Sequence, residues 1–232
     1  MTRTIYVYDS FAYLTEKLCL EVVGDYKVAP PNINLRARDI SGEHAPEGVQ
    51  VYAPQIPEEP GTAFPDIRQQ ARRTPEPLPD IFAPRRYPIV SEDFMAVVQD
   101  IDPGMHKFFP CLAYGEDGRP ISSKRYYHFW IERIVKVTAP EASENPASNL
   151  EMPSEFRFVN ATQEIGRYLA DLPIWTERVN FEPVFFSQEM RDAFKAAGLT
   201  GLEEYEKSHE ATREEDPVSR YRTVGQIWLD AD

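Results

Sequence analysis

The sequence has little cysteine and no long apolar run. Its 232 residues include two cysteines, Cys19 and Cys111, too few for a disulfide framework and not spaced as paired metal ligands. No stretch approaches the ~18 apolar residues of a membrane span, and the opening MTRTIYVYDS lacks the apolar core of a signal peptide. These absences argue against a secreted disulfide scaffold and a membrane protein. We expect a reduced, soluble, cytoplasmic protein.

The motifs of common enzymes are missing too. The sequence has no glycine-rich phosphate loop, no Gly-x-Ser-x-Gly elbow and no His-Glu-x-x-His zinc motif. Its histidines occur singly, and Cys111 sits among apolar neighbours that favour a buried small side chain. We therefore predict a protein that is not an enzyme, with no catalytic residues, cofactor or metal. The alternative is an enzyme of unrecognised type that uses dispersed residues such as His106, His128 and Glu132.

Basic residues are outnumbered by acidic ones. Lys and Arg total 25 against 38 Asp and Glu, a net charge of −13, and residues 87–232 carry most of the excess. A nucleic-acid-binding protein needs a basic face to displace counterions from phosphate, and this composition argues against one. The same charge favours a basic protein partner through electrostatic steering.

Proline divides the chain. Twelve of the 21 prolines lie between Pro30 and Pro88, so we expect residues 30–86 to form an irregular wrap without long helices or central strands. One short helix is predicted inside it, from Phe64 to Arg73. We divide the chain into an N-terminal strand with a Pro-rich arm (1–86), an α+β core (87–205) and an acidic C-terminal extension (206–232), which together form one compact unit.

Local patterns predict the elements of an α+β fold. Ser91 and Ser187 each follow a short apolar run and precede an amphipathic segment, as helix N-caps do, and Gly198 suits the end of the second helix. The expected sheet is antiparallel or mixed, with two short Ser-capped helices and the Pro-rich wrap. Its predicted strands are Thr4–Tyr8, Lys107–Tyr114, Arg125–Val137 and Thr223–Leu229, the middle two forming a hairpin.

Two features are typical of recognition surfaces. The run from Tyr126 to Ile131 is rich in aromatics on both faces of a strand, and an exposed face there would present interface anchors. An acidic stretch after residue 202 could meet a basic partner. The candidate partner-binding residues are Tyr126, Tyr127, Trp130, Glu203, Glu204 and Glu206.

The order of several landmarks resembles the immunity-protein-eleven family of bacterial polymorphic toxin systems, over residues 87–205. The resemblance implies an α+β antitoxin, encoded beside a toxin, that neutralises it by binding and has no catalytic residues. A protein-interaction or accessory module of a secretion or toxin locus is the alternative, and the oligomeric state stays open. The landmarks are Tyr87–Phe94, Gly104, His106, Phe108–Pro110, Arg125–Tyr127, Val184–Met190 and Lys195–Leu202.

Overall fold

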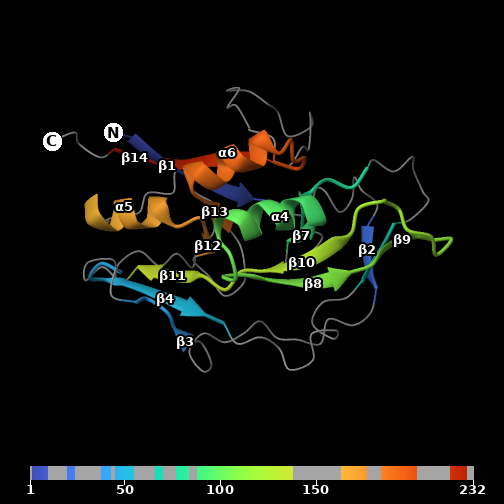
Figure 1. Cartoon of the computed structure of the whole chain (residues 1–232), viewed down its shortest axis with the longest axis horizontal. Helices are drawn as coiled ribbons and strands as arrows, with labels where there is room; N and C mark the ends of the chain where they lie inside the picture. The colour runs from blue at the N-terminus through green and yellow to red at the C-terminus, as the bar shows by residue number, and fades with distance from the viewer. Residues whose placement is uncertain are drawn as a thin grey trace.

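The chain folds into three sheets with helices packed against them, as an α+β protein (Figure 1). This architecture comes from a computed structural model and confirms the predicted fold class. The structure describes residues 2–9, 20–23, 38–42, 45–54, 66–69, 77–83, 88–137, 163–176, 184–202 and 220–228.

The largest sheet has seven strands in the order β14-β1-β13-β12-β11-β4-β3. Neighbouring strands are antiparallel except β11 and β12, which are parallel. It draws strands from all three stretches into which the sequence was divided. The strands are β1 (Thr2–Asp9), β3 (Arg38–Asp39), β4 (Val49–Ala53), β11 (Ile134–Val137), β12 (Ile174–Thr176), β13 (Val184–Phe186) and β14 (Arg220–Trp228).

Two smaller sheets complete the fold. The four-stranded sheet has the order β6-β7-β10-β8, and the three-stranded sheet has the order β2-β5-β9. The predicted hairpin is confirmed, because β10 pairs antiparallel with β8 and brings Tyr126 opposite Cys111. The strands are β6 (Ile81–Phe82), β7 (Ile89–Ser91), β8 (Lys107–Cys111), β10 (Tyr126–Trp130), β2 (Leu20–Val23), β5 (Asp66–Gln69) and β9 (Ala113–Gly115).

Both predicted hairpin strands are shorter than expected, because the chain changes sheet inside each run. At Leu112 it passes from β8 to β9: the Leu112 N–H donates to Asp66 at 2.8 Å, and its carbonyl accepts from the Ile67 N–H at 3.0 Å. These bonds turn the Leu112 side chain outward, with 66% of it exposed. Residues 131–133 make the second change, from β10 in the four-stranded sheet to β11 in the seven-stranded sheet.

The described helices are α4 (Glu92–Ile101), α5 (Gln163–Asp171) and α6 (Gln188–Ala196). Figure 1 shows α4 and α6 side by side, and the rings of Phe94 and Phe194 stack between them with centroids 4.6 Å apart. The Ser91 hydroxyl accepts from the Phe94 N–H, and Ser187 caps α6 in the same way. Gly198 follows α6 with φ 66°, a left-handed conformation that suits glycine.

Two expectations for the Pro-rich stretch were wrong. Residues 66–69 form strand β5 between β2 and β9, where a helix was predicted, and β4 lies inside the seven-stranded sheet between β3 and β11. The prolines stand just outside these strands, with Pro54 after β4 and Pro65 before β5, so they remove no ladder hydrogen bond. Residues 24–37, 55–65 and 70–76 lie outside the described residues, and the wrap stays a prediction.

Candidate functional site

Two clusters of polar side chains, each built around a buried carboxylate, lie at opposite ends of α4. The Asp80 cluster, at the start of the helix, consists of Asp80, Ser91, Lys124 and Thr200. The junction cluster, at its end, consists of Asp102, His106 and Arg133. Each joins segments that are far apart in the sequence, so the two clusters are the natural places to look for function.

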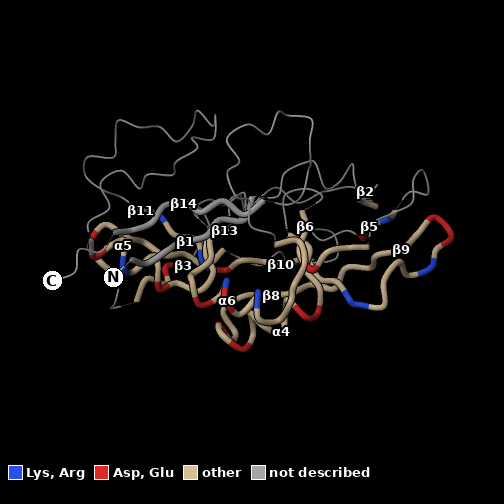
Figure 2. Tube along the Cα trace, turned by 90° about the horizontal axis from the view of Figure 1, so that it is seen from above, with Lys and Arg blue, Asp and Glu red and all other residues tan. Residues whose placement is uncertain are grey.

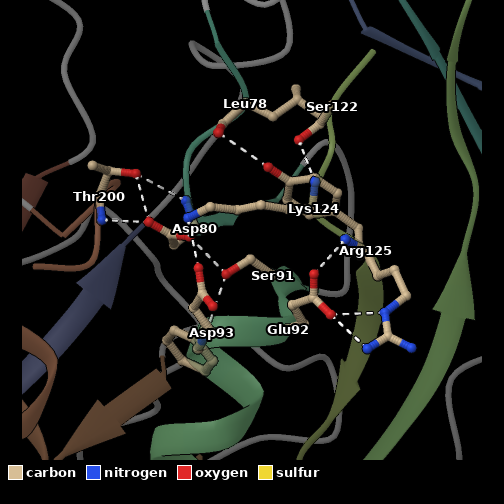
Figure 3. A network of polar contacts seen from close by, with 11 residues as sticks. Leu78, Asp80, Ser91, Glu92, Asp93, Ser122, Lys124, Arg125 and Thr200 are labelled. Carbon is tan, nitrogen blue, oxygen red and sulfur yellow. Dashed lines mark hydrogen bonds and ion pairs between the residues drawn. The ribbon is translucent and has the colours of Figure 1, made fainter. Parts of the chain in front are cut away.

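In the Asp80 cluster, one carboxylate accepts four hydrogen bonds (Figure 3). Its Oδ1 accepts from the Ser91 hydroxyl at 2.6 Å and from Lys124 Nζ at 2.7 Å. Its Oδ2 accepts from the Thr200 N–H and hydroxyl, both at 2.8 Å. Asp80 is only 2% exposed, and burial alone would raise its pKa. The hydrogen bonds from Lys124, Ser91 and Thr200 outweigh burial and hold the pKa of Asp80 below its usual range.

The outer rim of this cluster consists of ion pairs. Lys124 is 40% exposed and reaches past Asp80 to Asp93 on α4, at 2.8 Å. Hydrogen bonds to both carboxylates raise the pKa of Lys124. Glu92 pairs with the Arg125 guanidinium at 2.7 Å on the same side (Figure 3). The rim therefore carries no unpaired cation among the residues drawn, and its charges tie the loop before β10 to the first turn of α4.

The chain after α6 closes on the same point through a backbone contact. Gly201 has φ 85°, and a Cβ added there would overlap the Ile81 carbonyl oxygen and lie 2.9 Å from the Pro79 Cβ. The Asp80 N–H donates to the Thr200 carbonyl at 3.0 Å beside this contact. Only glycine fits this position, because the conformation and the close approach both exclude a side chain.

In the junction cluster, an arginine and a histidine share one carboxylate. The Arg133 guanidinium donates to both Asp102 oxygens, at 2.6 and 3.0 Å, and to the Ile174 carbonyl at 2.7 Å. His106 Nε2 lies 3.1 Å from Asp102 Oδ2, and the Glu132 N–H donates to His106 Nδ1 at 3.2 Å. Nδ1 is therefore an acceptor, so the proton is on Nε2, which donates to Asp102.

Electrostatics match this assignment. Burial alone would raise the pKa of Asp102, but the hydrogen bonds from His106 and Arg133 lower it to about 2. Burial lowers the pKa of His106, against the opposing hydrogen bond and charge of Asp102. The Asp102 carboxylate is thus charged and the His106 ring neutral near pH 7. A charged bidentate pair beside a neutral ring holds structure without a net buried cation.

In the two clusters the candidate nucleophile and the candidate base are enclosed, and the partly exposed Lys124 is paired with two carboxylates. The Ser91 hydroxyl is a buried helix cap, and the His106 side chain is fully enclosed. Burial raises the pKa of Cys111 to about 12, which leaves it a thiol. Within the described residues there is no group of three or more His, Cys, Asp or Glu side chains placed to hold a metal ion. In that same part of the chain, no helix is long and apolar enough to cross a membrane.

The dispersed set considered for catalysis comes together only in part. The Glu132 backbone touches the His106 ring, whereas His128 lies buried inside β10 between Ile89 and Phe109 of the neighbouring strands. Burial raises the pKa of the Glu132 carboxyl. The three side chains do not converge on a common open site in this structure.

The aromatic candidates for partner binding are mostly interior. Tyr126 is buried and donates its hydroxyl to the Leu78 carbonyl, and Trp130 is fully buried. Tyr127 is half-buried against the main core, the apolar cluster that includes Phe94, Phe129 and Phe194. Exposure was the condition for an anchoring role, and Tyr126 and Trp130 do not meet it, because packed layers cover both faces of β10. Glu203, Glu204 and Glu206 lie outside the described residues, so their role stays a prediction.

Sequence reasoning did not single out the residues at the centre of the clusters. Asp80 and Arg133 had no motif around them, and their partners lie 11 to 120 positions away along the chain. The available signal was the Thr200-Gly201 pair, which the resemblance included as a landmark. The structure gives both residues a role, because Thr200 bonds Asp80 and Gly201 contacts Ile81.

The described part of the chain is thus an α+β fold in which the buried Asp80 and Asp102 carboxylates are engaged in internal hydrogen bonds. Residues 21–208 match the Immunity protein family (Imm11), and the chain belongs to this family. The match confirms the resemblance noted in the sequence and extends it toward the N-terminus. A search of curated proteins found no match.

Proposed function

We propose that this protein is an immunity protein that binds a cognate bacterial toxin and neutralises it by occlusion, without catalysis of its own. The observation that carries the proposal is the Imm11 family match over residues 21–208. The enclosed state of His106 and the high pKa of Cys111 support a binding role, because neither group can act on a substrate as placed.

The proposed partner is a basic protein met in the cytoplasm. The net charge of −13 would steer a cationic surface toward this chain. Figure 2 shows acidic residues along α4 and α6 and at the turn after β9. Asp93, Asp100 and Glu189 on the two helices, with Glu116 in the turn, have exposed side chains. A partner drawn by this charge would bind more weakly as salt increases.

Capture from the host tests the proposal first. The tagged full-length protein is incubated with lysate of its host at low and high salt, and the retained proteins are identified by mass spectrometry. We expect one near-stoichiometric partner, encoded beside this chain and lost at high salt.

Growth then separates neutralisation from mere binding. The captured protein is expressed alone or with this chain, and colony counts are compared. Rescue by the chain is expected. Growth arrest that the chain does not relieve, or a retained partner with no toxicity, would contradict the immunity role and favour an accessory module.

A further inference from the structure

The junction cluster lies where the chain passes between the two larger sheets. Asp102 ends α4, His106 precedes β8 of the four-stranded sheet, and Arg133 leads into β11 of the seven-stranded sheet. Arg133 also reaches β12 through the Ile174 carbonyl, and its own carbonyl accepts from the Thr176 N–H at 3.0 Å. We propose that the junction cluster is an acid-sensitive joint, in which protonation of His106 releases residues 131–133 and loosens the contact between the two sheets.

The two bonds of the His106 ring require the neutral form. Nδ1 accepts the Glu132 N–H, and Nε2 donates to Asp102. A protonated ring carries hydrogens on both nitrogens, so Nδ1–H would face the Glu132 N–H and that bond would be lost. The Glu132 N–H belongs to the segment that links the sheets, so protonation acts directly on the link.

The charges around the ring oppose one another. Asp102 favours a protonated ring, but it already accepts both hydrogen bonds of the Arg133 fork. Arg133 from the link and Lys107 from β8 both disfavour a second cation, and burial adds to their effect. The His106 and Phe129 rings meet in a T-shaped pair with centroids 5.4 Å apart, and the Phe129 side chain has no oxygen or nitrogen that could accept a hydrogen bond.

Two further elements contribute groups near the joint. The half-buried Glu132 carboxyl interacts with the charges of Lys107 and of Arg38 in β3. The Tyr168 hydroxyl of α5 interacts with the charge of Arg133. Both act on neighbours of the ring rather than on its two nitrogens. When the joint opens, His106 returns to an ordinary pKa near 6.5. The opening equilibrium should therefore rise as pH falls below about 6.5, by up to about tenfold per pH unit.

Hydrogen exchange of the full-length protein, followed by NMR between pH 7.5 and 5, tests the joint. After correction for intrinsic exchange, the protection of the Glu132 and Thr176 amides should fall by up to about tenfold per pH unit below about pH 6.5. The Ser91 amide, which donates to the Asp80 carbonyl in the other cluster, is the reference and should hold its protection. Constant protection at the joint, or a fall that Ser91 shares, would overturn the proposal.

A matched pair of variants identifies the group responsible. In His106→Gln the amide oxygen can accept the Glu132 N–H and the amide nitrogen can donate to Asp102, with no titration in this range. We expect the pH dependence to disappear in His106→Gln and to persist in His128→Gln, the other buried histidine among the described residues. Persistence of the dependence in His106→Gln contradicts the proposal.

The unaltered protein supplies an independent readout if either variant fails to fold. The ring nitrogen signals of ¹⁵N-labelled histidine report the tautomer and charge of His106. The neutral ring with its proton on Nε2 is expected at pH 7, and its loss should coincide with the loss of Glu132 protection. A ring already protonated at pH 7, paired with Asp102, would overturn the joint.

Discussion

At Asp80, a single carboxylate connects four segments of the chain: the strand β6 region, the start of α4, the loop before β10 and the loop after α6. A buried acceptor with four donors leaves each donor dependent on it. Its removal therefore leaves Lys124, Ser91 and Thr200 without this acceptor, and the loss of stability should be far larger than on removal of a surface charge.

Asp80→Asn should lower the free energy of unfolding by about 2–4 kcal/mol, because an amide removes the charge and replaces one acceptor with a donor. Urea denaturation at pH 7 measures the change. Asp192→Asn is the control: Asp192 is exposed on α6 and accepts hydrogen bonds from Gln188 and Arg191 of its own helix. Its change should stay within about 0.5 kcal/mol. Equal effects of the two variants would contradict the central role of Asp80.

Gly201→Ala should destabilise more than Gly104→Ala, although both glycines have a positive φ, 85° and 73°. A left-handed alanine costs about 1–2 kcal/mol at either position. At Gly201 the methyl group also meets Ile81, whereas at Gly104 nothing lies within 4 Å. We expect an additional loss of about 1–3 kcal/mol at Gly201, measured by denaturation. If the two variants lose the same stability, the close contact has no energetic weight.

At the scale of elements, the sequence predicted correctly the features that depend on neighbouring residues, and it did not predict those that depend on residues far along the chain. Ser91, Ser187 and Gly198 lie at the helix ends where the sequence placed them, because caps depend on atoms within a few residues. The pairing of β8 with β10 was predictable because both runs are rich in aromatic residues and follow one another along the chain.

Elements whose identity depends on remote neighbours were missed. Residues 66–69 have no strong local preference, and they become strand β5 because β2 and β9 pair with both edges. Leu112 looks like the interior of a strand until Asp66 and Ile67 draw its backbone into another sheet. Helix α5 and strand β12 were not predicted at all, and β12 is only three residues long.

The two helix caps differ in what their hydroxyls do besides capping. Ser187→Ala should lose about 1 kcal/mol, the usual value for an N-cap. Ser91→Ala should lose about 1–2 kcal/mol more, because the Ser91 hydroxyl also donates to the buried Asp80 carboxylate. Denaturation curves of both variants measure these losses of stability. In an Asp80→Asn background, the difference in stability between the Ser91 and Ser187 variants should shrink. A Ser91 variant no weaker than the Ser187 variant would contradict this coupling.

For the whole molecule, the sequence predicted that the partner-binding surface is acidic, but it did not predict where on the fold that surface lies. Charge excess is a property of composition and is visible in the sequence. The burial of Trp130 could not be predicted from the sequence, because the same aromatic strand could have one covered face or two. Here α4 and α6 pack over it with β12 and β13, so the main core includes Phe129 and Trp130 together.

The acidic stretch after residue 202 should govern the rate of association with the proposed basic partner. Reversal of Glu203, Glu204 and Glu206 to Lys is expected to slow association by about tenfold or more at low salt, with little change in thermal stability. The matched control reverses Glu47, Glu164 and Asp171, which are exposed, are not among the acidic residues named for the partner, and change the net charge equally. Surface-plasmon resonance across salt concentrations measures both. Equal slowing would assign the effect to total charge rather than to this stretch.

The position of β1 in the largest sheet has a consequence for how the protein is made. Strand β1 lies between β13 and β14, and Tyr8 stands opposite Val184 and Tyr221. A ribosome adding roughly 5–20 residues per second therefore holds this strand for roughly 10–35 s before β13 is synthesised. Its described sheet partners do not yet exist in that interval. The nascent chain consequently presents an unpaired strand, which ribosome-associated chaperones are suited to shield, and the seven-stranded sheet closes only near the end of translation.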